Sequence, residues 1–305
     1  MTARRNKKHK GDYRLPVFIT FLVACIAAAG SFVLSSVYPQ NGMPDNTVEE
    51  KTEHARWDTE DIPGRTEEPE EPIQYCHWET PRLLTARSEQ IIEHLAYTVS
   101  YNHDWHLPNW VAYELTTHEL QGENSRSDKF LPDPAVKGNP VVTKDYSGSG
   151  YDRGHMAPAG DMRWSDQAMK ESFYMTNMCP QNHSNNAGDW KDLEELVRDL
   201  AAKHGNIYIC CGPIVTDTSN TIGSARKIVV PQAFYKVLLR CKKDGTWTSI
   251  GFVMPNAAGS RPLMTYMQSV DEVEQLAGID FFYLLPDSVE NAIEADYTIA
   301  DWNVK

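Results

Sequence analysis

Short apolar runs, separated by polar turns that contain glycine or proline, recur along the chain from Cys76 onward. Runs of this length that are rich in β-branched and aromatic residues predict β-strands. Strands are therefore expected over residues 97–101, 110–115, 173–177, 206–211, 234–241 and 248–255. Gly212-Pro213 is expected to end the fourth of these, and Lys243-Asp244-Gly245 predicts a hairpin between the last two.

Apolar residues at helical spacing predict three helices, over residues 88–95, 165–172 and 188–204. Helices and strands are thus mixed along the chain, and the sequence contains no internal repeat. Residues 76–305 are accordingly predicted to form one α+β domain.

The N-terminal quarter of the chain has a different pattern. Residues 1–14 are basic, residues 15–38 are uncharged and mostly apolar, and residues 39–75 are acidic and contain several prolines. An apolar stretch of about 20 residues spans a bilayer, and basic residues before it remain in the cytoplasm. We expect a transmembrane signal anchor over 15–38 and a disordered acidic linker over 39–75, with the folded domain on the non-cytoplasmic side.

Two alternatives to an anchor remain open at this point. The small residues Ala27 to Ser31 could serve as a signal-peptide cleavage site, which would release a secreted protein. Leu22-Val23-Ala24-Cys25 is similar to a bacterial lipoprotein box, which would leave a lipid-anchored one.

The formal net charge of −13 argues against a broadly basic surface of the kind that holds nucleic acid. Most of this charge falls within residues 76–305, so the terminal segments do not account for it. Any binding of phosphate must depend on a local basic site and a metal ion, and it should weaken at raised salt. The six cysteines show no zinc-ligand spacing.

Two polar segments carry the chemistry. Residues 145–155 read DYSGSGYDRGH and end in His155, and residues 177–194 read NMCPQNHSNNAGDWKDLE. An unperturbed imidazole titrates near neutrality, so His155 is suited to remove a proton from water. The amide and carboxylate oxygens of the second segment are the donors that a hard cation such as Mg²⁺ prefers. Together the segments indicate a site that cleaves phosphodiester bonds.

The order and spacing of these residues resemble those of the DNA/RNA non-specific endonucleases, which are ββα-metal nucleases. The residues that carry the resemblance are Asp152-Arg153-Gly154-His155, Asn177, Pro180-Gln181, Asn186, Trp190 and Leu193-Glu194. The similarity extends from about Tyr97 to about Pro286. It implies a ββα-metal nuclease fold with a central, mostly antiparallel sheet flanked by helices, and a terminal helix and Phe-Phe turn over 270–285.

The resemblance also implies roles for single residues. His155 is expected to be the general base, and Asn186 the ligand of one hydrated Mg²⁺, with Mn²⁺ as a substitute. Glu194 is expected to accept hydrogen bonds from the waters around the ion. At about 100° per residue on one helix, Asn186 and Glu194 can face one cleft. Asn185 is a rival ligand, and Asn186 could equally begin the helix as a cap.

Three more residues belong to the implied catalytic set, each with a structural alternative. Asn177 either supports the ion and the base or is a turn residue at a strand end. Arg126 stands where the family has a phosphate-binding arginine, or is a surface arginine. Arg153 either contacts phosphate or holds its strand by pairing with acids. Asp152 is expected to position the strand that carries His155.

The reaction implied is Mg²⁺-dependent endonucleolytic hydrolysis of DNA and RNA that leaves 5′-phosphate products. Nucleic acid is the expected substrate, the membrane is contacted through the N-terminal anchor, and no protein partner is inferred. Two hypotheses from other classes compete: a catalytically silent nuclease-like module that binds nucleic acid, and a cell-surface interaction module on an acidic stalk. The presence of His155, Asn186 and Glu194 favours the enzyme.

Overall fold

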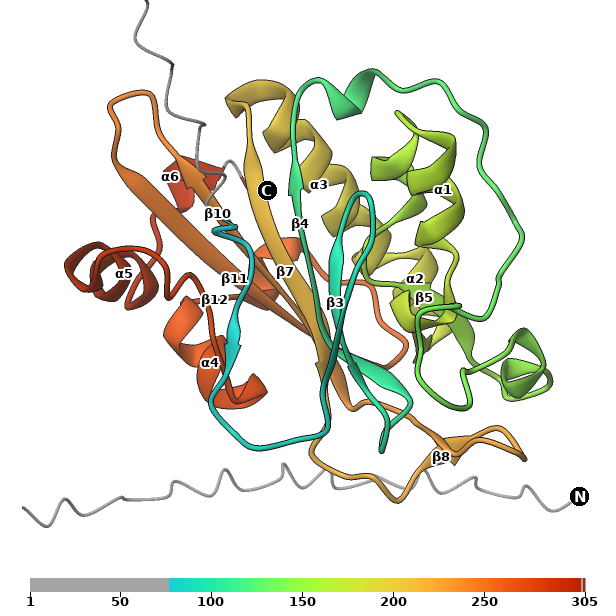
Figure 1. Cartoon of the computed structure of the whole chain (residues 1–305). Coiled ribbons are helices and arrows are strands. Elements are labelled where there is room, and N and C mark those ends of the chain that lie inside the picture. The colour runs from blue at the N-terminus through green and yellow to red at the C-terminus, as the bar shows by residue number, and fades with distance from the viewer. Residues whose placement is uncertain (1–76, 303, 305) are drawn as a thin grey trace, which may run out of the picture. The chain divides into compact units, whose positions relative to one another are not determined.

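A seven-stranded antiparallel sheet runs through the part of the chain that the computed structural model describes, residues 77–302 and 304. Its strands follow the order β12-β11-β10-β7-β4-β3-β2 (Figure 1). Their bounds are β2 (Gln90–Glu93), β3 (Thr98–Asn102), β4 (Leu107–Leu115), β7 (Ile207–Ile214), β10 (Ala233–Cys241), β11 (Trp247–Pro255) and β12 (Met267–Gln268). The hairpin of β10 and β11 is the one that the turn at Lys243-Asp244-Gly245 predicts.

Three two-stranded ladders accompany the main sheet. They pair β1 (Arg82–Leu83) with β13 (Ile279–Asp280), β5 (Asp152–His155) with β6 (Met178–Gln181), and β8 (Thr221–Ile222) with β9 (Ile228–Val229). The helices are α1 (Asp166–Ser172), α2 (His183–Ala187), α3 (Asp189–His204), α4 (Val270–Ala277), α5 (Asp287–Glu294) and α6 (Ile299–Trp302). Short 3-10 turns occupy Glu119–Gln121, Thr143–Tyr146, Ala159–Met162, Met175–Asn177 and Leu263–Tyr266.

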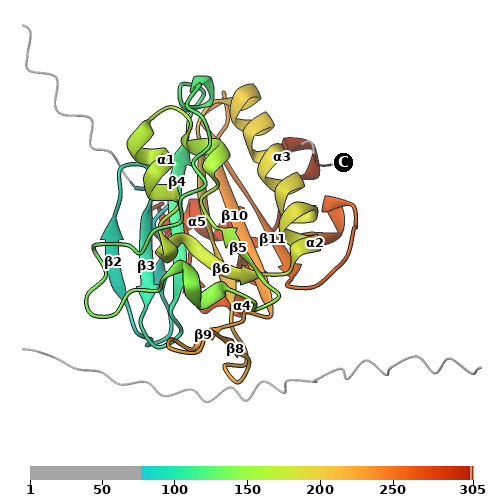
Figure 2. The ribbon, with the colours of Figure 1, turned by 90° about the vertical axis from the view of Figure 1, so that its right-hand side faces the viewer.

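Both faces of the central strands are covered, which explains why their sequences are nearly continuous apolar runs. In β10, Phe234 and Leu238 belong to the core shared with α3, whereas Tyr235 and Val237 belong to the core shared with α4. Alternate residues of a strand point to opposite faces. Helix α3 and the β5–β6 hairpin therefore cover one face, and α4 with α5 covers the other (Figure 2).

The predicted α+β fold with a central antiparallel sheet and flanking helices is confirmed. Helices 165–172 and 188–204 form as α1 and α3, and Ser165 caps α1 by accepting a hydrogen bond from the Ala168 N–H. The terminal helix forms as α4, and the Phe-Phe turn after it is buried.

Three predictions about single elements are wrong. Residues 88–95 contain the edge strand β2, in which Ile92 is buried and Ile91 exposed, because backbone pairing with β3 outweighs the helical spacing of three apolar residues. Residues 173–177 end α1 and form a 3-10 turn, so the strand begins only at Met178. Strand β7 continues through Gly212-Pro213, because its pairing with β4 ends at Cys211 and a missing N–H is tolerated beyond that point.

The predicted basic tail, membrane anchor and acidic linker all lie outside the described residues. Within residues 77–302, no helix combines the length and the apolar character that crossing a membrane requires.

Candidate active site

The β5–β6 hairpin brings the two polar segments of the sequence together. Gly154 pairs with Cys179, and His155 at the end of β5 pairs with Met178. A Cβ atom on Gly154 would lie 1.9 Å from the side-chain oxygen of Gln181. Glycine is therefore required at this position of the Asp-Arg-Gly-His sequence because the Gln181 side chain crosses directly over it.

His155 is held among aromatic rings. Its ring centroid lies 4.9 Å from that of Phe173, edge to face, and 5.7 Å from that of Phe130. The Trp190 indole N–H donates a hydrogen bond to the His155 backbone oxygen, at 3.2 Å. The side chain is largely buried, and its Nε2 atom has no hydrogen-bond partner among the described residues. The imidazole is thus fixed in place, and its buried Nε2 is left without a partner among the described residues.

This environment lowers the pKa of His155. Burial, and next the positive charge of Arg126, lower the pKa of the imidazole to about 3. The expectation of a ring that titrates near neutrality is therefore wrong, because it assumed an unperturbed histidine. A neutral imidazole is the form that accepts a proton, so His155 is in the basic form throughout the neutral range.

Asn186 is oriented by Asp152. The Asn186 Nδ2 donates a hydrogen bond to Asp152 Oδ2 at 3.0 Å, and His183 Nδ1 lies 2.8 Å from the same oxygen. This bond fixes which end of the amide faces Asp152 and leaves Asn186 Oδ1 without a partner among the described residues. Asp152 is predicted to position the histidine strand, and the structure adds that its carboxylate orients the amide.

Asn186 and Glu194 do not share one helix, contrary to the prediction. Gly188 ends α2 and precedes α3, with φ −114° and ψ −111°, so Asn186 lies in a separate short helix. The helical-wheel argument for their common orientation is therefore wrong, and Asn182, not Asn186, caps α2. Both side chains nevertheless line the same cleft. The rival Asn185 is buried and does not line it.

Glu194 is half-buried, and no described residue donates a hydrogen bond to its carboxylate. Burial raises the pKa of this carboxyl to about 7, and the positive charge of Lys236 opposes the increase. Lys236 is fully buried, and its Nζ lies 4.8 Å from the centre of the Trp190 ring. Near neutral pH, Glu194 therefore exists in both charged and neutral forms.

Two of the predicted arginines rest on aromatic rings at the cleft. The Arg126 guanidinium lies 5.2 Å from the Phe173 ring centre, and the Arg153 guanidinium lies 5.1 Å from that of Phe130. Arg153 also donates a hydrogen bond to the Thr143 backbone oxygen, at 3.2 Å. Stacking leaves the edges of a guanidinium free to donate hydrogen bonds. Arg126 is also exposed, and its Nε lies 3.6 Å from Asp128 Oδ1, so the surface alternative for this residue stays open. No described acid pairs with Arg153, so its acid-pairing alternative does not describe its position.

Asn177 does not line the cleft, in contrast to its predicted place in the catalytic set. It is fully buried, and its Oδ1 accepts the Ala157 N–H at 2.9 Å. Its Nδ2 donates to the backbone oxygens of Ala157 and Ser172, both at 2.8 Å. The residue therefore fixes the segment that follows His155.

Sequence reasoning missed Arg198, which also lines the cleft. Its Nη1 donates to Asp161 Oδ1 at 2.8 Å, and the Asp161 carboxylate is buried. A signal was available, because Arg198 follows Glu194 by four residues and such residues are neighbours on a helix. Lys191, which also lines the cleft, was missed as well.

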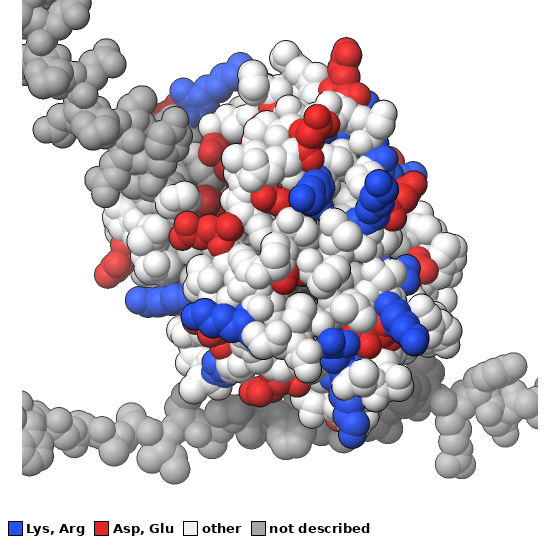
Figure 3. All heavy atoms as spheres, turned by 45° about the vertical axis from the view of Figure 1, so that its right-hand side comes forward, with Lys and Arg blue, Asp and Glu red and all other residues white. Residues whose placement is uncertain are grey.

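The cleft is basic although the chain as a whole is acidic. It has a volume of about 470 Å³, and four basic side chains face two acidic ones along its walls. They are Arg126, Arg153, Lys191 and Arg198 against Asp152 and Glu194. Elsewhere on the coloured surface in Figure 3, basic and acidic side chains are interspersed. Positive charge is thus concentrated where a phosphate could approach His155, Asn186 and Glu194.

Comparison with known proteins identifies a family for this chain. The model of the family described as DNA/RNA non-specific endonuclease matches residues 79–288. The mitochondrial nuclease EXOG of Danio rerio is 38% identical over 202 residues, which cover 61% of this chain and 59% of that relative. Nuclease C1 of Cunninghamella echinulata var. echinulata is 35% identical over 213 residues, which cover 65% of this chain and 84% of that protein.

A solved structure is also similar. A chain in the crystal structure of the EndoG/EndoGI complex has a TM-score of 0.61 and 30% sequence identity, and the match covers 66% of this chain and 89% of that one. The chain thus matches nearly all of this solved chain but less than two thirds of the length of the EXOG relative.

Proposed function

The chain belongs to the DNA/RNA non-specific endonuclease family, which consists of metal-dependent nucleases, and on this basis we propose that it hydrolyses internal phosphodiester bonds of DNA and RNA, leaving 5′-phosphate products. The observation that carries the proposal is the convergence of three groups on one basic cleft. They are the neutral His155 imidazole, the free Asn186 amide oxygen and the Glu194 carboxylate.

The donors present fit a hydrated Mg²⁺ ion. Asn186 Oδ1 is a neutral, hard oxygen that is oriented by Asp152, and Glu194 provides carboxylate oxygens that can accept hydrogen bonds from surrounding waters. Mg²⁺ keeps several of its waters and needs few protein ligands, so one amide and one nearby carboxylate are sufficient. When bound, the ion would neutralise negative charge on the phosphate as the reaction proceeds.

His155 acts as the base in this proposal. A water molecule loses a proton to the imidazole and attacks phosphorus in line. The bond from phosphorus to the 3′ oxygen breaks, and that oxygen takes a proton from solvent and leaves as a 3′-hydroxyl. His155 then returns its proton to solvent. The phosphate remains on the 5′ oxygen of the other product. Arg126, Arg153 and Arg198 donate hydrogen bonds to phosphate oxygens and disperse the charge that accumulates there.

The proposed contacts involve the phosphate and neither the base nor the sugar. Both DNA and RNA, single- or double-stranded, are therefore expected substrates. Because four basic side chains of the cleft supply the electrostatic attraction, we expect cleavage to slow as the salt concentration increases.

The test is to incubate the full-length chain and Mg²⁺ with supercoiled plasmid and with a single-stranded RNA, and then to determine the product ends. The proposal expects internal cleavage of both substrates and ends that a ligase can join without prior phosphorylation. Chelator should stop both reactions. Binding of plasmid without cleavage in Mg²⁺ or Mn²⁺ would instead support the silent nucleic-acid-binding module.

We also propose that the catalytic domain lies on the non-cytoplasmic side of a membrane. The basic residues 1–14 followed by the apolar residues 15–38 support this topology. The domain should fractionate with the cells, and protease added to intact cells should digest it. Release into the medium would indicate cleavage of the N-terminal segment, and full protection of the domain would contradict the proposed side.

A further inference from the structure

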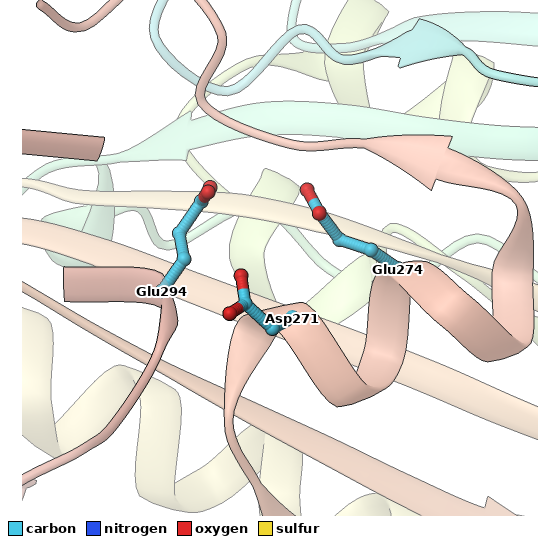
Figure 4. Close-up of side chains that lie close together, drawn as sticks. All are labelled: Asp271, Glu274 and Glu294. Carbon is cyan, nitrogen blue, oxygen red and sulfur yellow. The ribbon is translucent and has the colours of Figure 1, made fainter. Parts of the chain in front are cut away.

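A cluster of three carboxylates lies on the face of the sheet opposite the catalytic cleft. Asp271 and Glu274 come from α4, one turn apart, and Glu294 is the last residue of α5 (Figure 4). One oxygen atom from each lies within 4.8 Å of the others. Both helices pack on β11, whereas His155 and Glu194 belong to the other layer. The cluster is therefore separate from the proposed active site.

Glu294 shows that this cluster is more than a group of surface acids. The residue is 4% exposed, and its Oε1 is buried with no hydrogen-bond partner among the described residues. Figure 4 shows the carboxylate pointing toward Asp271 and Glu274. An unsatisfied buried carboxylate is costly, and such groups are normally paired or bound to a metal. The structure thus lacks a partner for this oxygen.

The neighbouring sequence offers no cation to supply that partner. Residues 270–294 contain seven acidic side chains and neither lysine nor arginine. The nearby Arg82 is already bound to Asp280, with 2.6 Å between Nε and Oδ2. Glu294 also stands at the C-terminal end of α5, where the helix dipole is negative and disfavours another negative charge. The described residues around Glu294 therefore supply no positive charge to its carboxylate.

We propose that Asp271, Glu274 and Glu294 form a binding site for a divalent cation of the calcium type, which joins α4 to the end of α5. All three donors are carboxylates, which favour a hard cation over zinc. Calcium lies about 2.3–2.6 Å from each ligand oxygen, so oxygens within 4.8 Å of one another can share one ion. One Glu274 oxygen accepts the Phe281 N–H at 2.7 Å, and its other oxygen is free to bind.

The ion would link two helices through carboxylates that no described cation pairs. We expect it to stabilise the fold and to leave the chemistry of the cleft unchanged. Because α4 and α5 cover the sheet face opposite α3, loss of the ion should first loosen these two helices.

The experiment is a calcium titration of the full-length, chelator-treated chain that carries Asn186→Ala, so that the catalytic cleft lacks its proposed ligand. Isothermal titration calorimetry should detect one Ca²⁺ per chain. At a calcium concentration a hundredfold above Kd, Tm should rise by roughly 5–10 °C. Glu294→Gln should weaken binding at least tenfold. Asp287→Asn, which removes one exposed charge from the same helix, should leave the affinity within twofold.

Glu294→Gln should also fold normally, because the amide has the same shape as the carboxyl group that it replaces. If its Tm in chelator is lowered instead, Asp271→Asn supplies the same comparison at a less buried position. The proposal is overturned if calcium neither shifts Tm nor binds, or if both variants bind calcium as the parent does. None of these outcomes depends on nuclease activity, so the site and the proposed function are tested separately.

Discussion

Removal of the Asp152 carboxylate should weaken the response to Mg²⁺ and largely preserve the maximal rate. Asp152 Oδ2 accepts the hydrogen bond from Asn186 Nδ2 at 3.0 Å, and this bond determines which end of the amide faces the cleft. Without it, the Asn186 side chain can rotate so that a donor, not an acceptor, faces the ion. Asp152→Ala is therefore expected to lower the affinity for Mg²⁺ by disturbing the orientation of the Asn186 amide.

The expected magnitude follows from the geometry. Residues that orient a metal ligand typically change metal affinity about 10–100-fold, which corresponds to about 1.4–2.7 kcal/mol. The Asp152 side chain is 33% exposed, so the lower half of that range is the better expectation. Asp152→Asn should give a smaller effect, because its amide oxygen still accepts the hydrogen bond, though as a neutral group.

The assay is the initial rate of plasmid nicking over a range of Mg²⁺ concentrations. For Asp152→Ala we expect the half-saturating Mg²⁺ concentration to rise about tenfold, with the rate at saturation within about threefold of the wild type. His183→Ala is the matched control, because His183 contacts the same oxygen but its side chain is 78% exposed. An unchanged Mg²⁺ dependence, or a large loss that persists at saturating Mg²⁺, would refute the reasoning.

Three further predictions concern protonation and packing. Because the pKa of Glu194 is about 7, the cleavage rate should fall about tenfold per pH unit below neutrality. Added Mg²⁺ should shift this acid limb of the pH–rate profile to lower pH. Glu194→Gln should lose most of the activity and should show no such limb. The unfolded state takes up a proton at His155 below its ordinary pKa of about 6.5, whereas the folded state does so only near pH 3. Between pH 7 and 4.5, the wild type should therefore lose about 2.5 kcal/mol more unfolding free energy than His155→Asn in urea titrations. Asn177→Ala leaves three buried backbone groups without partners and should lower the unfolding free energy by about 3–5 kcal/mol.

Each of these has a contradicting result. A pH limb that survives in Glu194→Gln would assign it to another group. Parallel pH dependences of stability for the wild type and His155→Asn would contradict a buried, neutral histidine. An Asn177→Ala protein of normal stability but low activity would restore a direct catalytic role for Asn177.

The structure brings together on one cleft three residues that the sequence singled out, although the local structure around them differs from the prediction. His155, Asn186 and Glu194 could be identified because their chemistry and order are recognisable without knowledge of the backbone. Their geometry could not be derived, because Gly188 separates α2 from α3 and a periodicity argument assumes one unbroken helix. Likewise, apolar spacing at residues 88–95 is compatible with a helix until the neighbouring strand β3 is known.

Properties that arise from burial were equally out of reach. The low pKa of His155 depends on aromatic rings from Phe130 and Phe173, which are distant in sequence. The basic cleft combines Arg126 and Arg153 with Arg198 on α3, and only folding assembles them. The acidic net charge led to the expectation of a local basic site, but it could not indicate which side chains form it.

The central claim is that His155 and a divalent cation act together on one phosphodiester bond. It is tested most directly by plasmid cleavage with the full-length wild type and with His155→Ala, each in Mg²⁺ and in chelator, beside a filter-binding measurement of DNA affinity. We predict that the wild type cleaves only with Mg²⁺, and that His155→Ala binds DNA equally well but cleaves about 10²–10⁴-fold more slowly. Cleavage by His155→Ala at the wild-type rate, or by the wild type in chelator, would contradict the account.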